Sequence, residues 1–204
     1  QRLAETAYRS AESLLGVINN ILDFSKIEAG RLELHAEEIE LRRLLDDTLE
    51  LLAEQAHRKG ICLIGDLPPD LPQRVSCDAT RLRQILVNLL GNAVKFTQQG
   101  EVRLSAAANP LSGKEMLLYL QISDTGPGLA HTAPEKFFKP GISTKSLTNG
   151  GLGLAIVRRI VAHHQGRVHA ENRPGGGARI VLTLPLQRKE TPRWWNRLKR
   201  RSPA

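Results

Sequence analysis

The feature that most restricts the fold of this sequence is a carboxylate at the end of an apolar strand, followed by two glycines around a proline. The run at 116–122 is apolar and β-prone and predicts a central strand, and Asp124-Thr125-Gly126-Pro127-Gly128 predicts a rigid turn directly after it. Because such a turn carries little side-chain bulk, a flat ligand could approach its backbone while Asp124 accepts a hydrogen bond. An ordinary turn has the same composition, so this stretch alone leaves both interpretations open.

Composition narrows the class of protein. The 204 residues are 41% hydrophobic and 25% charged, which is typical of a globular domain with appendages. Most of the formal charge of +8 lies in residues 188–204, which hold seven lysines and arginines against one glutamate. We therefore expect no specific nucleic-acid binding by the folded body. Cys62 and Cys77 lie in apolar surroundings, and we expect two buried, unreactive thiols.

The order of the secondary-structure elements predicts an α/β layer fold. Periodicity predicts helices at 3–27, 41–59, 79–96 and 152–165, and strands at 31–39, 61–65, 75–77, 101–108, 116–123, 167–173 and 178–184. Asp78 is the expected N-cap of the third helix. The segment 129–150 is expected to be a long irregular loop, and Pro174-Gly175-Gly176-Gly177 joins the last two strands.

The first predicted helix has an apolar stripe too wide for a helix that packs alone. Its seam residues alternate spacings of four and three: Leu3, Ala7, Ser10, Leu14, Val17, Ile21 and Phe24. Further apolar positions widen the seam, as in a four-helix bundle. The pattern is already helical at Gln1, so we expect this sequence to be a piece of a longer protein. Other helices of that protein, or a second subunit, would cover the apolar stripe. The apolar stripe expected for the second helix is Leu41, Leu44, Leu45, Thr48, Leu49, Leu51 and Leu52.

Polar residues share one face of the predicted 79–96 helix. Gln84, Asn88, Asn92 and Lys95 recur at spacings of four and three, beside the apolar stripe. Asparagine oxygens are suitable ligands for Mg²⁺, and a lysine can neutralise phosphate. An exposed polar face is the alternative that this spacing leaves open.

Closely spaced glycines mark the start of the 152–165 helix. In Asn149-Gly150-Gly151-Leu152-Gly153-Leu154, backbone N–H groups could meet phosphate at the positive end of the helix. The stretch matches neither the Walker P-loop nor the Rossmann fingerprint. The preceding loop contains Phe137-Phe138, which could anchor a lid, and Lys145, which could reach a phosphate.

Taken together, these stretches resemble the sequence boxes of sensor histidine kinases. Residues 81–97 resemble the N box, 124–128 the G1 box, 137–140 the F box and 149–154 the G2 box, in the family's order. Residues 19–30 look like the end of a dimerisation helix in a form frequent among hybrid kinases. The resemblance implies a two-layer α/β sandwich of the Bergerat (GHKL) type, with three helices on a mixed sheet, preceded by a helix of a dimerisation bundle.

The resemblance also implies roles for individual residues. Asp124 would bind the adenine amino group, and Gln84 and Asn88 would be catalytic, with Gln84 orienting the accepting imidazole. Asn88 and Asn92 would hold Mg²⁺. The implied contacts to ATP come from Asn88, Asn92, Lys95, Phe96, Asp124, Gly126, Gly128, Thr144, Lys145, Gly151, Leu152, Gly153 and Leu154.

The implied organisation has three parts. Residues 1–30 would be the second dimerisation helix, 31–187 the catalytic domain, and 188–204 a basic tail or linker. The family's phosphoacceptor box is absent, so the accepting histidine would lie outside this chain. We expect a homodimer through residues 1–30, a response regulator or receiver domain as partner, and a cytoplasmic domain of a membrane-bound sensor. The alternative is a degenerate kinase that acts as a regulatory protein-interaction module.

Overall fold

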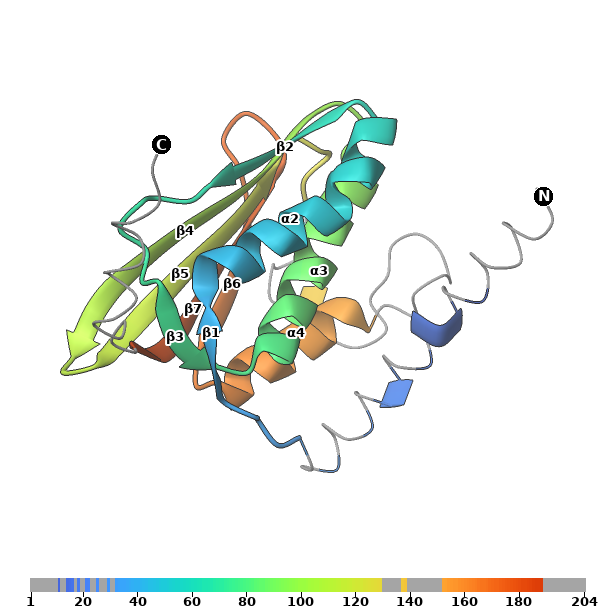
Figure 1. Ribbon diagram of the computed structural model, residues 1–204. Helices are drawn as coiled ribbons and strands as arrows, with labels where there is room; N and C mark the ends of the chain where they lie inside the picture. The colour runs from blue at the N-terminus through green and yellow to red at the C-terminus, as the bar shows by residue number, and fades with distance from the viewer. Residues whose placement is uncertain are drawn as a thin grey trace.

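The computed structural model describes residues 32–129, 137–138 and 152–188, with scattered positions between 11 and 29. Within that part of the chain, three helices cover one face of a seven-stranded sheet (Figure 1). The elements in chain order are β1 (Glu37–Glu40), α2 (Leu41–Arg58), β2 (Ile61–Asp66), β3 (Arg74–Cys77), α3 (Ala79–Phe96), β4 (Gly100–Ser112), β5 (Glu115–Asp124), α4 (Gly153–His163), β6 (Arg167–Asn172) and β7 (Ala178–Arg188). The predicted two-layer α/β sandwich with three helices is confirmed.

The sheet places β5 near its centre. The strand order is β1-β3-β7-β5-β4-β2, and β6 pairs with the first half of β7, while β3 pairs with its end. The β2–β4 pair is parallel and the other pairs are antiparallel, so the sheet is mixed, as predicted. Since β5 lies between β4 and β7, both edges of the strand that ends at Asp124 are held.

The hydrophobic core lies between the sheet and the helices. Alternate residues of the long strands, such as Leu104, Leu120 and Leu182, are fully buried against the helical layer. The central helix α3 contacts both α2 and α4 and buries its apolar stripe completely, with Ile85 and Leu86 at 0% exposure. The polar face of α3 is consequently held in a fixed position relative to the end of β5.

Three sequence-based expectations about the elements were partly wrong. The strand predicted at 31–39 is limited to Glu37–Glu40, and residues 32–36 are irregular. The strand predicted at 101–108 extends to Ser112, because pairing with β5 continues as far as Ser112↔Glu115. Leu51, expected in the apolar stripe of α2, is 63% exposed, since the helical rotation gives the buried position to Leu52.

The two cysteines differ in environment. Cys77 is buried, and burial, together with the charges of Asp78 and Glu37, raises the pKa of its thiol to about 12. This thiol is protonated and unreactive at neutral pH, as expected. Cys62 lies on the edge strand β2 and is exposed, so the expectation of burial was wrong for this residue.

Within residues 1–30, the structure describes only part of the predicted bundle helix. The described positions between 11 and 25 are helical, and Leu14, Ile18, Ile21 and Leu22 are exposed. The division into a bundle helix, a catalytic domain and a tail stays a prediction. None of the helices in the described part of the chain is long and apolar enough to cross a membrane.

Lys59 joins the end of α2 to the end of α3. Its Nζ donates hydrogen bonds to the carbonyl oxygens of Val94, Lys95 and Thr97 at 2.6, 2.8 and 2.8 Å. The last carbonyls of a helix lack partners within the helix, and the C-terminal end of a helix carries partial negative charge. A single ammonium group therefore satisfies three acceptors next to the predicted site residues Lys95 and Phe96.

We predict that Lys59→Met destabilises the domain. The variant keeps an unbranched apolar stem but leaves three half-buried carbonyls without their donor, which should lower the free energy of unfolding by about 1–3 kcal/mol. Urea denaturation measures this change. Arg58→Met is the matched control, because Arg58 is exposed and its contact with Glu54 spans 3.7 Å; equal effects of the two changes would contradict the role given to Lys59.

Candidate functional site

The Asp124 carboxylate is oriented by backbone groups from two segments. Its Oδ1 accepts hydrogen bonds from the N–H of Gly126 at 2.8 Å and of Ala178 at 3.2 Å. Among the described residues, no hydrogen bond reaches Oδ2. One oxygen of this half-buried carboxylate is thus fixed by the protein, and the other can accept a hydrogen bond from a ligand.

The hairpin between β6 and β7 packs directly on the turn that follows Asp124. The Arg173 guanidinium donates to the Asp124 carbonyl oxygen at 2.8 Å. Gly177, with φ of +88°, approaches so closely that a Cβ on it would overlap that carbonyl oxygen. At the far end of the turn, Asn172 accepts from the Leu129 N–H at 2.6 Å and donates to the Leu129 carbonyl at 3.1 Å. The hairpin therefore holds both ends of the Asp124–Leu129 segment.

The side of the turn nearer to α3 meets the C-terminal end of that helix. A Cβ on Gly126 would lie 3.2 Å from Thr97 Oγ1 and 3.0 Å from Asp124 Oδ1. Thr97 follows the last residue of α3, Phe96, whose ring is partly exposed and lies 5.5 Å from Lys95 Nζ. The absence of side-chain bulk at Gly126 allows Asp124 and the end of α3 to come together.

The predicted polar face of α3 borders the start of α4. Gln84, Asn88, Asn92 and Lys95 are all half-buried, so this face is not the fully exposed surface that its spacing had left possible. A Cβ on Gly153 would lie 3.1 Å from Asn88 Oδ1. Leu152 is the N-cap of α4 and gives no side-chain cap hydrogen bond, so the first backbone N–H groups of α4 lie beside Asn88 without a side-chain cap.

These contacts fit an adenine nucleotide. Thr97 Oγ1 is buried and has no hydrogen-bond partner among the described residues, and both it and Asp124 Oδ1 border the backbone of Gly126. An amino group and a neighbouring ring nitrogen would satisfy such groups directly or through water. The start of α4, with Asn88 beside it, can bind anionic oxygens. In the described residues, no cluster of three or more His, Cys, Asp or Glu side chains could hold a metal ion.

Some predicted site residues lie outside the described part of the chain. Thr144, Lys145 and Gly151 belong to this group.

Two other predicted residues are described by the structure. In the expected lid anchor, Phe138 is 5% exposed and belongs to the hydrophobic core. Gly128 has the positive φ, +75°, that its place in the turn requires, and a Cβ there would clash with Asn172.

Reasoning from the sequence missed the residues that hold the turn. Asn172 and Arg173 gave no signal, because they act on the backbone of residues 43 and 49 positions away. The three consecutive glycines of the hairpin were the sequence feature that could have indicated a close approach to another segment. Only one of the three, Gly177, packs against Asp124, since a Cβ on Gly175 or Gly176 would meet nothing within 4 Å.

We predict that Gly177→Ala greatly weakens nucleotide binding, whereas Gly176→Ala does not. Both residues have positive φ, +88° and +103°, so the conformational cost of a side chain, on the order of 1 kcal/mol, is shared. Only the methyl group at 177 would push the hairpin away from Asp124 and remove the Ala178 hydrogen bond. Calorimetric titration with ATP compares the variants, and equal affinities would contradict the proposed packing.

Comparison with known proteins identifies the family of this chain. Residues 77–188 match the family of histidine kinase-, DNA gyrase B-, and HSP90-like ATPases. The sensor histidine kinase GacS of Pseudomonas protegens is 39% identical over 89% of this chain, and the signal transduction histidine-protein kinase BarA of Escherichia coli is 37% identical over the same share. The chain spans about a fifth of the length of each, 20%.

Solved structures show the same fold. The crystal structure of full-length ShkA in complex with AMPPNP superimposes with a TM-score of 0.79 at 35% identity, over 94% of this chain and 40% of ShkA. The histidine kinase AdeS of Acinetobacter baumannii, at 22% identity and a TM-score of 0.68 over 93% of this chain and 86% of AdeS, shares the fold. On the matched residues, this chain belongs to the histidine kinase-, DNA gyrase B-, and HSP90-like ATPase family, and it corresponds to the ATP-binding catalytic domain of sensor histidine kinases.

Proposed function

We propose that this chain binds ATP through Asp124 and transfers the γ-phosphoryl group to a histidine of a helical dimerisation domain. The observation that carries the proposal is the carboxylate of Asp124, with Oδ1 held by two backbone N–H groups and Oδ2 left to accept from a ligand. The exocyclic amino group of adenine is a donor that matches Oδ2. Gly126 and Gly128 line the base, and Phe96 lies beside it.

The phosphates are assigned to α3 and α4. The backbone at Leu152, Gly153 and Leu154 binds anionic oxygens at the start of α4, where the helix dipole is positive. Lys95 neutralises phosphate charge, and we assign Thr144, Lys145 and Gly151 to the same task from their sequence positions. Asn88 and Asn92, one helical turn apart, hold Mg²⁺, which offsets the negative charge of the phosphates when it is bound.

In the transfer itself, a ring nitrogen of the acceptor histidine attacks the γ-phosphorus. The bond from phosphorus to the bridging oxygen breaks, and ADP leaves with that electron pair. The imidazole, made cationic by the attack, releases the proton of its other ring nitrogen to water. The domain contributes positioning and electrostatic stabilisation, and forms no covalent bond. Gln84 and Asn88 are the residues that we place beside the acceptor, with Gln84 orienting its ring.

We extend the proposal to the whole protein. The exposed Leu14, Ile18, Ile21 and Leu22 in the described helical positions support dimerisation through residues 1–30. A response regulator or receiver domain would then take the phosphoryl group, in a sensor anchored to the membrane outside these residues. The names of the relatives, which are sensor kinases, support this extension.

Asp124→Asn should strongly weaken nucleotide binding without unfolding the domain. Asparagine keeps an oxygen for the N–H groups of Gly126 and Ala178, but it presents an amide donor where adenine needs an acceptor. Loss of a charge-assisted hydrogen bond is worth about 1.5–3 kcal/mol, so ATP affinity should fall by at least roughly tenfold. Calorimetry and a thermal melt measure the two effects. Asp66→Asn, at the exposed end of β2, is the control, and unchanged ATP affinity in Asp124→Asn would refute the adenine assignment.

Asn92→Ala should remove the Mg²⁺ dependence of ATP binding. With one amide oxygen missing, titrations with and without Mg²⁺ should give similar affinities, whereas the wild type should bind more tightly with the ion. Asn109→Ala, in the exposed outer part of the β4–β5 hairpin, is the matched control. Persistence of the dependence in Asn92→Ala would rule out a metal-binding role for this residue.

A further inference from the structure

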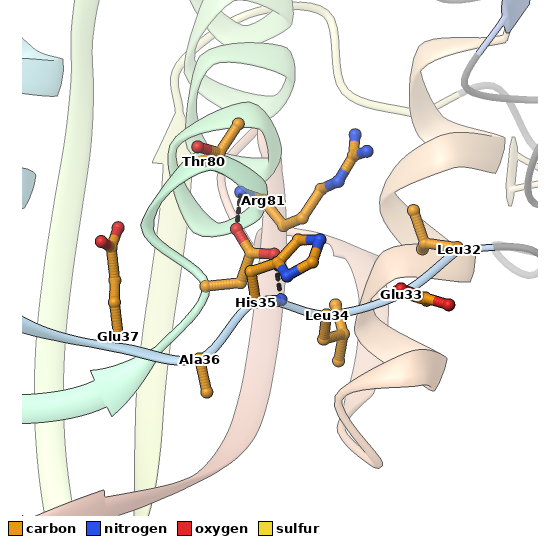
Figure 2. A pocket seen from close by; sticks show the side chains of 9 residues that line it. Leu32, Glu33, Leu34, His35, Ala36, Glu37, Thr80 and Arg81 are labelled. Carbon is orange, nitrogen blue, oxygen red and sulfur yellow. Dashed lines mark hydrogen bonds between the residues drawn. The ribbon is translucent and has the colours of Figure 1, made fainter.

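Residues 32–36, here called the linker, are fastened to the first turn of α3 by Asp78. One carboxylate oxygen of Asp78, Oδ1, accepts from the Arg81 N–H at 2.9 Å and caps the helix. The other, Oδ2, accepts from the His35 N–H at 3.0 Å, across 43 residues of sequence. Figure 2 shows the linker passing this turn at His35 and Arg81, with both hydrogen bonds drawn as dashed lines.

The Asp78 carboxylate contacts the linker and α3 at once, so a movement of the linker would also move the first turn of α3. The Asp78 residue is 6% exposed, and both of its hydrogen bonds are partly buried. Leu32, at the other end of the linker, is 7% exposed and belongs to the core. The linker is therefore held at two points, one apolar and one charged, before β1 begins.

Arg81 links the capped first turn of α3 to Gln84, on the polar face of the same helix. Its Nη1 donates to Gln84 Oε1 at 2.7 Å. A guanidinium group has only donors, so the amide atom that faces it must be the carbonyl oxygen, and the nitrogen end of Gln84 is turned away from Arg81. Arg81 therefore holds the oxygen end of the Gln84 amide, and Arg81 itself lies on the helical turn that Asp78 caps.

We propose that Arg81 is a positioning residue for Gln84, and that Asp78 couples both to the linker. The proposal rests on the function proposed above, in which Gln84 orients the acceptor histidine. The linker enters the domain from the predicted bundle helix, and its course determines the position of the first turn of α3. That position determines how Gln84 is oriented toward the acceptor histidine. Arg81 acts through Gln84 and touches no reacting atom.

The first test is a double-mutant cycle on the full chain, with the dimerisation domain of GacS supplied as phosphoacceptor. Arg81→Ala should lower the phosphotransfer rate by roughly 10- to 100-fold, as for a misplaced catalytic group, while ATP affinity stays unchanged. In a Gln84→Ala background, Arg81→Ala should have no further effect. Arg83→Ala is the control, because Arg83 faces Asp47 of α2 at 3.7 Å. If Arg81→Ala and Gln84→Ala lowered the rate additively, the proposal would be overturned.

The second test separates the linker contact from the helix cap. Asp78→Ser keeps an N-cap oxygen for Arg81 but has no second oxygen for the linker. The His35 amide should then exchange with solvent at least tenfold faster, and phosphotransfer should slow, while the melting temperature changes little. Unchanged exchange at His35, or unchanged transfer despite faster exchange, would contradict the coupling.

A third measurement needs no catalysis. The side-chain amide of Gln84 should give a shifted NMR signal in Arg81→Ala but not in Arg83→Ala. If the wild type transfers no phosphate, the proposed function fails, and this signal still decides whether Arg81 orients Gln84. An unshifted signal would overturn the positioning role whatever the activity.

Discussion

The contact between Gly177 and the end of β5 is the interaction on which the rest of the site depends. Because Gly177 has no side chain, the β6–β7 hairpin reaches the Asp124 carbonyl, and the next N–H, from Ala178, reaches the carboxylate. Arg173 and Asn172 then hold the two ends of the same turn. The orientation of the carboxylate is thus set by backbone hydrogen bonds, which tolerate little displacement.

Helix α3 connects this turn with the remaining site residues. Its apolar side forms the middle of the core and its polar side forms the site, so the same burial that stabilises the domain places the amides. Side chains from outside the helix satisfy both ends: Asp78 at the start and Lys59 at the finish. A helix held in this way can act as one rigid part between the linker and the turn that follows Asp124.

Much of this arrangement could be predicted from local patterns. The Asp78 cap, the buried stripe of α3 and the order of the glycine-rich stretches follow from spacing and backbone preference within a few residues. The sequence-based predictions were wrong where contacts with distant segments determine the local structure. Residues 109–112 are strand because β5 pairs with them, and Cys62 is exposed because it lies on the face of β2 opposite to the buried Ile61. Lys59 gave no signal, since its acceptors are backbone atoms 35 to 38 residues away.

The sequence by itself determined the kinds of elements, their order, and the residue types available to a nucleotide, because periodicity and glycine conformation are local properties. Only the tertiary structure decided which oxygen of Asp124 is left for a ligand, that Gly153 adjoins Asn88, and that the linker is bound to Asp78. Each of these depends on hydrogen bonds or close approaches between segments far apart in the chain. Such contacts exist only after the helices have packed on the sheet and brought those segments together.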